Sequence, residues 1–374
     1  MSQSSQQSFW QSFFLDTWYR KRWWAWLLLP IAWLYQLLSF FHAYFQKKKT
    51  IRLPVPVIVI GNISVGGTGK TPVIIALAKA LEEQGIAVGI ISRGYGSDAP
   101  YYPYSVKADN DYAQVTGDEP LLIARSTGCP VVIAKDRVAA AQSLLQAHPQ
   151  VQALLSDDGL QHYRLGRDIE VVVVDSERGL GNHFCLPAGP LREPAKRLAS
   201  VDWVLLHHEH LDDAIEPPSD SSDESSQEST ASQDHTPHRL LPIALAPTAW
   251  RHVASQQEYP LQPLPWLTSS TVTDSAPVMM AGIGHPQRFF NTLGSMGIEG
   301  DGFAFDDHYQ YTNNDFALWQ ERVVLMTEKD AVKCHEIDHS QLWSLQVNMV
   351  LPSVLVTRIV QQLRSSVDKA DVTH

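Results

Sequence analysis

Residues 55–72 read VPVIVIGNISVGGTGKTP, and this stretch decides the fold of the first half of the chain. The apolar run at 55–60 predicts a buried parallel strand, and the glycine-rich loop after it opens a helix. Such a loop turns its backbone N–H groups inward, where they hold phosphate oxygens. The residues expected to contact a nucleotide are Ser64, Val65, Gly66, Gly67, Thr68, Gly69, Lys70 and Thr71.

Two side chains of this loop have a predicted role in phosphate chemistry. Lys70 is expected to reach the β- and γ-phosphates, and the Thr71 hydroxyl to bind Mg²⁺. A strict phosphate-loop pattern has glycine five residues before Gly69, where this chain has Ser64. The motif is therefore a variant, and its strand–loop–helix context favours nucleotide binding over a glycine-rich turn without a ligand.

Composition and charge narrow the class of protein. The 374 residues are enough for two domains and a sizeable core. The three cysteines are far apart in the sequence, which argues against a disulfide framework or a zinc site and favours a reducing compartment. Residues 1–52 carry seven Lys or Arg and one Asp, whereas the whole chain has a net charge of −11. A basic end on an acidic body favours contact with anionic lipid and argues against nucleic acid as a partner.

Trp23–Phe45 is an almost wholly apolar segment that lies between two basic clusters, 20–22 and 47–49. As one helix it would be about 34 Å long, enough to span a bilayer. Polar residues at 36, 39 and 42 share one side, and six of the eleven tryptophans lie in the first 45 residues. These features favour an anchor in the membrane surface over a spanning helix, and a spanning helix over a soluble core helix. The run lacks a small-residue cleavage site, so a cleaved signal peptide is not expected.

The body of the chain alternates apolar strands with helical stretches. A helix is predicted at 72–84, and strands at 86–91, 131–134, 153–155 and 170–174. This alternation predicts a mostly parallel sheet with helices on both faces and chemistry at the carboxyl ends of the strands. Further strands are predicted at 278–281 and 323–326.

The predicted organisation has four parts. Residues 1–50 form a membrane-anchoring helix, and residues 51–215 form a P-loop NTPase-type domain. Residues 216–238 are polar and acidic, and this composition predicts a disordered insert. Residues 239–374 form a smaller C-terminal α/β domain.

Two pairs of neighbouring carboxylates in the first domain are candidate site residues, one after a predicted strand and one before a predicted helix. Asp157 and Asp158 follow an apolar strand, where P-loop enzymes hold Mg²⁺, although an aspartate that caps a turn would look similar. Asp118 and Glu119 precede a helix that starts with Pro120. Capping explains one of these two carboxylates, and the other is a candidate metal ligand or general base.

The predicted second domain contributes two weaker signals. His308 follows Asp307, and an aspartate beside a histidine can fix the tautomer of the ring, although an isolated match is more often a surface histidine. Thr327 is expected to cap a short helix with Asp330 at its third position, and Lys329 between them is a candidate binding residue.

In combination these motifs closely resemble the tetraacyldisaccharide 4'-kinase family, the lipid A 4'-kinases of Gram-negative bacteria. The resemblance extends over most of residues 20–335 as an ordered series of segments, at 61–72, 92–96, 117–120, 157–162, 186–194, 281–290, 307–308 and 326–333. Three features depart from the family pattern, and one of them is the acidic insert at 216–238, which is an addition to it. His207-His208 and His285 stand where asparagine is expected.

The resemblance implies an activity, a fold and a location. The expected reaction is ATP-dependent phosphorylation of the 4'-hydroxyl of a tetraacylated glucosamine disaccharide 1-phosphate, which forms lipid IVA on the cytoplasmic face of the bacterial inner membrane. The expected fold is a pair of Rossmann-like α/β/α domains joined by a short β-ribbon, with the active cleft between them. The expected cofactors are ATP and Mg²⁺, and the enzyme is expected to be a monomer on the membrane surface.

The resemblance also implies roles for single residues. Asp118 corresponds to a catalytic carboxylate that works with the histidine at position 308. Asp157 corresponds to a catalytic or Walker-B-like residue, and Lys70 to the phosphate-binding lysine. Thr71, Glu119 and Asp158 correspond to the Mg²⁺ site.

Two other classes of function remain open from the residues alone. A membrane-associated P-loop ATPase switch would bind partners and have no phosphoryl acceptor, and it would need no base such as Asp118. A nucleotide-binding scaffold without turnover is disfavoured by the intact Lys70 and Thr71.

Overall fold

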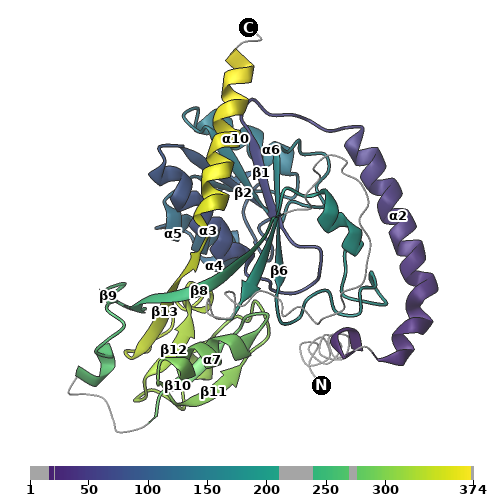
Figure 1. The fold of residues 1–374 in the computed structure, drawn as a ribbon. Coiled ribbons are helices and arrows are strands. Elements are labelled where there is room, and N and C mark those ends of the chain that lie inside the picture. The colour runs from purple at the N-terminus through teal and green to yellow at the C-terminus, as the bar shows by residue number, and fades with distance from the viewer. Residues whose placement is uncertain (1–16, 21, 210–238, 269–275, 372–374) are drawn as a thin grey trace, which may run out of the picture.

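The computed structural model describes residues 17–20, 22–209, 239–268 and 276–371. In this part of the chain the strands join in one continuous twisted sheet with the order β11-β10-β12-β13-β8-β7-β6-β1-β5-β2-β4-β3, and β9 (Glu258–Tyr259) pairs with β8. The sheet runs through two lobes, of which the second is smaller (Figure 1). The predicted α/β class, with two packed α/β units, is confirmed.

The first lobe is a parallel sheet covered on both faces. Its strands are β1 (Val57–Gly61), β2 (Val88–Ser92), β4 (Val131–Ile133), β5 (Ala153–Asp157), β6 (Ile169–Asp175) and β7 (Trp203–His208), with the antiparallel β3 (Tyr104–Ser105) at the edge. Alternate residues of β1 face opposite sides of the sheet, as the twofold period of a strand requires. Ile58 and Ile60 share a core with α3 (Lys70–Glu83), whereas Val57 and Val59 share one with α6 (Arg137–Ala147). Shorter helical segments are α4 (Ala113–Thr116), α5 (Asp118–Thr127) and η2 (Ala195–Ser200).

The second lobe is built on one end of the same sheet. Its strands are β10 (Val278–Ala281), β11 (Asp301–Ala304), β12 (Val324–Thr327) and β13 (Leu342–Val350). Met279 and Phe289 belong to the core under α7 (Pro286–Ser295), and Met280 and Phe316 to the core on the other face. The remaining helical segments are η4 (Pro265–Thr268), α8 (Asn313–Phe316) and α9 (Glu328–Ala331).

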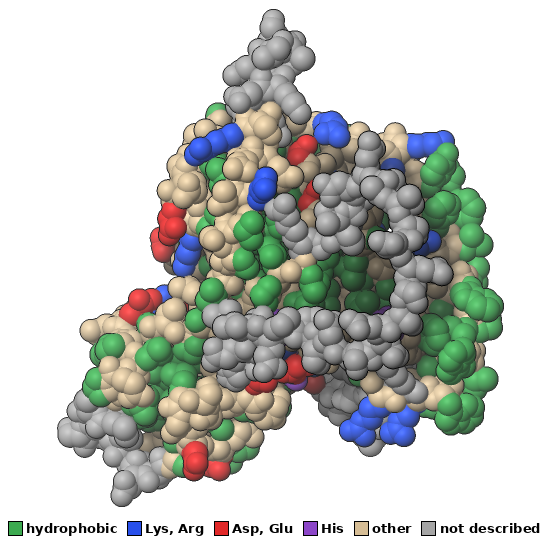
Figure 2. Space-filling model, in the orientation of Figure 1, with side chains coloured by type: hydrophobic (Ala, Val, Ile, Leu, Met, Phe, Trp, Pro, Cys, Tyr) green, Lys and Arg blue, Asp and Glu red, His purple; other side chains and the backbone are tan. Residues whose placement is uncertain are grey.

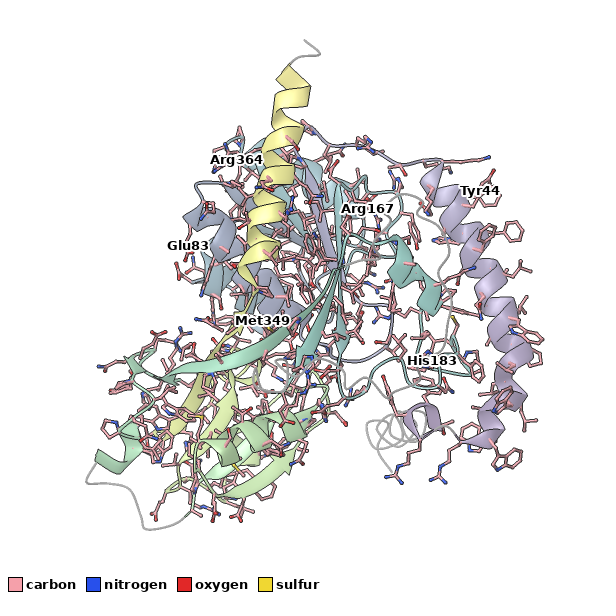
Figure 3. All side chains as sticks on the ribbon, viewed as in Figure 1. Tyr44, Glu83, Arg167, His183, Met349 and Arg364 are labelled. Atoms are coloured by element: carbon pink, nitrogen blue, oxygen red, sulfur yellow. The ribbon has the colours of Figure 1, made fainter. Side chains whose placement is uncertain are left out.

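One long strand belongs to both lobes. The first part of β8 (Arg239–His252) pairs in parallel with β7, and from Ala244 onward the strand pairs antiparallel with β13. The chain returns to the first lobe along β13, where Met349 enters the core of that lobe (Figure 3). The β8–β13 pair is therefore the ribbon that joins the lobes.

The C-terminal helix departs from the predicted domain division. Helix α10 (Ser353–Asp371) packs against α3, and Leu355, Ile359 and Leu363 lie in the same core as Ile58. The predicted unit 239–374 therefore combines the second lobe with a helix that completes the first. The predicted insert, residues 216–238, lies outside the described residues.

The N-terminal apolar segment also differs from the prediction of one helix. Trp23–Leu28 forms a 3₁₀ helix, η1, and the α-helix α2 begins at Leu29 and ends at Lys47. The break falls at Pro30, which lacks a backbone N–H and is therefore tolerated only in the first turn of an α-helix.

Helix α2 turns its apolar side chains away from the protein. Figure 2 shows hydrophobic side chains gathered along the outer side of α2, and Tyr44 points outward in Figure 3. Of the residues on the predicted polar side of the helix, Gln36 and Ser39 are half-buried against the protein, whereas His42 is exposed. Within the described residues, the segment Trp23–Lys47 is long and apolar enough to cross a membrane and is mostly exposed.

Candidate active site

The phosphate loop connects β1 to α3, as predicted. Gly66 and Gly69 have φ angles of 107° and 87°, in the region that favours glycine. Glycines in this conformation let consecutive backbone N–H groups converge into an anion-binding concavity. A Cβ on Gly69 would lie 2.5 Å from Nδ1 of His207, so the imidazole packs directly on the loop. The loop geometry thus requires glycine at position 69 for two independent reasons.

Asp157 lies at the carboxyl end of β5, beside the loop. The Ser92 hydroxyl donates a hydrogen bond of 2.7 Å to its Oδ2, whereas Oδ1 is buried and has no hydrogen-bond partner within the described residues. Burial, followed by the charges of Glu119 and Asp158, raises the pKa of Asp157 to about 6. A buried carboxylate oxygen without a partner is suited to a cation or a metal-bound water.

Asp158 turns toward the cations of the site. Its Oδ1 lies 3.6 Å from Nζ of Lys70, and its Oδ2 lies 3.0 Å from Nη1 of Arg192. Burial alone would raise the pKa of Asp158, but Lys70 and Arg192 outweigh it and lower the pKa. Asp158 is therefore a carboxylate that stays ionised beside the phosphate loop.

Asp118 and His308 meet across the cleft between the lobes. Asp118 opens α5 in the first lobe, and His308 lies in the loop after β11 in the second. Nδ1 of His308 is 3.0 Å from Oδ1 and 2.9 Å from Oδ2 of Asp118. Burial would raise the pKa of Asp118, yet the His308 hydrogen bond and Lys329 lower it overall. The pair combines a buried, ionised carboxylate with a positioned imidazole, which are the components of a general base.

Lys329 connects the carboxylates of both lobes. Its Nζ lies 2.9 Å from Glu119, 3.0 Å from Asp307 and 3.8 Å from Asp118. Burial would lower the pKa of Lys329, but these carboxylates raise it above its ordinary value. Lys329 is therefore a fixed positive charge within the acidic cluster, and its predicted binding role stays a prediction.

A cleft of about 1300 Å³ brings these groups together. The predicted residues that line it are Val65, Gly66, Gly67, Thr68, Gly69, Lys70, Thr71, Glu119, Asp157, Asp158 and His308. Asp118 is buried behind His308, and Ser64 pairs through its backbone with Leu191 instead of lining the cleft. The structure thus gathers the predicted residues, with Ser64 at the margin.

Comparison with known proteins identifies the family. A model of the family described as tetraacyldisaccharide-1-P 4'-kinase matches residues 24–364. The chain belongs to this family. The resemblance seen in the sequence is therefore confirmed, and the protein is a kinase.

Individual relatives support the same assignment over nearly the whole length. The tetraacyldisaccharide 4'-kinase of Legionella pneumophila (strain Corby) is 40% identical over 342 residues, which cover 91% of this chain and 94% of the relative. That of Aeromonas salmonicida (strain A449) is 41% identical over 353 residues, which cover 93% and 96%. The crystal structure of LpxK from Aquifex aeolicus in complex with ATP is 26% identical, has a TM-score of 0.68 and covers 91% of this chain and 99% of that one.

Two further contacts between the lobes of the kinase were not predicted from the sequence. Arg288 of α7 reaches Asp175 at the end of β6, with 3.2 Å between Nη2 and Oδ1. The Arg178 side chain donates a hydrogen bond of 3.0 Å to the carbonyl of Gly284. Asp175 ends an apolar strand, as Asp157 does, so its position was a usable signal for a site residue.

Proposed function

We propose that this kinase transfers the γ-phosphoryl group of ATP to the 4'-hydroxyl of a tetraacylated glucosamine disaccharide 1-phosphate, which yields lipid IVA. The observation that carries this proposal is the Asp118–His308 pair, which meets in the cleft that the phosphate loop lines. A hydroxyl that accepts a phosphoryl group must be oriented and must lose its proton, whereas a nucleotide-binding scaffold without turnover needs no such pair.

The chemical step divides between the two walls of the cleft. The hydroxyl oxygen attacks the γ-phosphorus, the bond to the β–γ bridging oxygen breaks, and ADP leaves. The Asp118–His308 pair, whose imidazole lines the cleft and whose carboxylate lies behind it, orients the hydroxyl and accepts its proton. Lys70 and the loop N–H groups stabilise the negative charge on the phosphoryl oxygens.

The residues present fit a Mg²⁺ ion that neutralises charge on the phosphates during transfer. The unpartnered Oδ1 of Asp157 supports this fit. Thr71 and Asp158 line the same cleft as Asp157. The remaining predicted ligand is Glu119, whose carboxylate pairs with Lys329. Glu119 would have to give up this ion pair in order to bind the metal.

We propose that the substrate lies in the inner membrane and that α2 places the kinase there. The outward apolar face of α2 supports insertion into the surface of the inner membrane from the cytoplasmic side, where ATP is present. Because both lobes of one chain supply the site, we propose a monomeric enzyme.

A second, separate cavity borders α2. It has a volume of about 330 Å³ and lies between His42 and Gln46 of α2 and the first lobe. Its wall contains Lys135, Arg137 and Arg164, together with one carboxylate, Asp136, which pairs with Arg164, so the wall carries a net positive charge. This charge suits the phosphorylated head group of an anionic lipid.

The deciding experiment supplies the purified kinase with Mg²⁺, ATP labelled at the γ-phosphate and the disaccharide 1-phosphate lipid in detergent micelles. We expect label on the lipid and ATP consumption that depends on it. Asp118→Asn is the matched control, because it keeps the shape of the side chain and removes the base. ATP consumption that is equal with and without lipid would instead support the ATPase switch.

A further inference from the structure

The second lobe approaches the phosphate loop at two points, one direct and one through another residue. Gly284 lies against Gly67, since a Cβ on Gly284 would stand 2.9 Å from the Gly67 nitrogen. Arg288 reaches the loop indirectly, through the buried side chain of His207. His207 lies near the end of β7 and takes no part in the chemistry described above.

His207 holds the backbone of the loop. Its Nδ1 lies 3.1 Å from the carbonyl oxygen of Thr68, and the ring packs on Gly69. In a trans peptide the C=O and the following N–H point in opposite directions. A carbonyl of Thr68 that points toward His207 therefore directs the N–H of Gly69 in the opposite direction, away from the ring.

The same nitrogen has a second partner from the other lobe. Nη1 of Arg288 lies 3.1 Å from Nδ1 of His207. Burial, followed by the charge of Arg288, lowers the pKa of His207 to about 4, so the ring is neutral at pH 7. A neutral imidazole has one N–H, and Nδ1 either donates or accepts. It can donate to Thr68 or accept from Arg288, but it cannot do both at once.

We propose that His207 is a positioning residue of the phosphate loop, and that Thr68 and Arg288 compete for its Nδ1. When Nδ1 carries the proton, the Thr68 carbonyl is held and the N–H of Gly69 is oriented for phosphate. When Arg288 donates to Nδ1, the Thr68 carbonyl loses this donor. The second lobe thereby opposes the arrangement of the loop that binds nucleotide. This inference rests on the proposed function, because it requires that the phosphate loop binds ATP.

The first test measures binding of Mg·ATP to the full-length kinase by titration calorimetry without lipid. His207→Leu removes the donor and should weaken ATP binding about three- to tenfold, the range for loss of one hydrogen bond. His207→Asn keeps an N–H at the same number of bonds from Cα and should restore most of the affinity. The KM for the lipid should not change in either variant. Unchanged ATP affinity in His207→Leu, or equal weakening in both variants, would overturn the positioning role.

A matched control separates this effect from general loss of stability. His339 is also buried, and its Nε2 lies 2.9 Å from the carbonyl of Trp319 in the second lobe, away from the phosphate loop. His339→Leu should lower the melting temperature without weakening ATP binding. If it weakened ATP binding as much as His207→Leu does, the effect would be structural and the inference would fail.

The second test concerns the competition. Arg288→Met should tighten ATP binding in the native background, because Nδ1 is then free to donate to Thr68, and should have no effect in the His207→Leu background. Arg288→Lys keeps a cation beside Asp175 and serves if the Met variant does not fold. Equal effects in both backgrounds would overturn the competition. A native kinase that neither binds ATP nor phosphorylates lipid would instead contradict the proposed function.

Discussion

Nδ1 of His308 lies 2.9 Å from Oδ2 of Asp118, and this contact joins side chains that are 190 residues apart and belong to different lobes. The site is therefore complete only when both lobes stand in this arrangement. Because the two residues belong to different lobes, phosphoryl transfer depends on closure of the cleft. Closure also excludes water from the reacting groups.

The first prediction concerns Asp118 and His308 as one unit. Asp118→Asn and His308→Ala should each lower kcat about a hundredfold to ten-thousandfold, the range for loss of general acid–base catalysis, with little change in ATP affinity. Because each residue works through the other, the double variant should be little slower than the slower single variant. Steady-state kinetics of the three variants measure this. Losses that multiply would show that the residues act separately.

The second prediction concerns stability against pH. The Asp118 bond raises the pKa of His308 above 6.5 although burial opposes it, and the pKa of Asp118 lies below 3.8. The contribution of His308 is fully present below about pH 6.5 and is lost as the pH rises through its raised pKa. The contribution of Asp118 is present above about pH 3.8 and is lost as the pH falls through its lowered pKa. The pair should therefore stabilise the protein most between about pH 4 and 6.5.

Denaturant unfolding of the native kinase and of His308→Gln from pH 4 to pH 9 measures this contribution. The difference in the free energy of unfolding should be largest in the acidic half of the range and decrease above it. A difference that stays constant over the whole range would contradict the ion pair.

The third prediction concerns Lys329, whose charge helps to keep the pKa of Asp118 low. Lys329→Met removes that charge, so the pKa of Asp118 should rise and the acidic limb of the pH profile of kcat/KM should move to higher pH. Lys329→Arg keeps the charge and should return the limb toward its native position. An unmoved acidic limb in Lys329→Met would indicate that Lys329 acts only in packing.

The sequence predicts the local features of this molecule well. The phosphate loop, the parallel strands and the aspartates at their ends depend on short apolar runs and on glycine and carboxylate positions next to them, which are local signals. The observed β5, Ala153–Asp157, extends the predicted strand at 153–155 by two residues, Ser156 and Asp157.

The features that were not predicted depend on long-range contacts. The sharing of β8 between the lobes and the return of α10 to the first core are set by which strands pair and which faces remain uncovered. The contacts of Lys329 with Glu119 and of Arg288 with His207 join segments 210 and 81 residues apart. The charges of these residues and their spacing in the sequence do not predict which of them meet in the fold.

The fourth prediction concerns the phosphate loop. Lys70→Ala removes a charge that follows the phosphoryl oxygens into the transition state, so turnover should fall on the order of a hundredfold or more. Asp158 would also lose one of its two cations. Assays at saturating ATP separate this loss from weaker nucleotide binding. Near-native turnover under those conditions would contradict the assignment of the loop.

The last prediction concerns the outward face of α2, where Trp33, Leu37 and Phe41 are spaced four residues apart and are 65%, 52% and 48% exposed. Insertion of a large apolar side chain into lipid is worth about 1.5–3 kcal/mol, so replacement of all three by Ser should lower binding to anionic liposomes by about a hundredfold or more. Sedimentation with liposomes measures the binding, and calorimetry should find unchanged ATP affinity. Leu318→Ser is the control, because Leu318 is 88% exposed in the second lobe, far from α2 in the sequence. If the triple variant and the control sedimented equally well, the face would not be the membrane contact, and the basic clusters beside the helix would have to supply it.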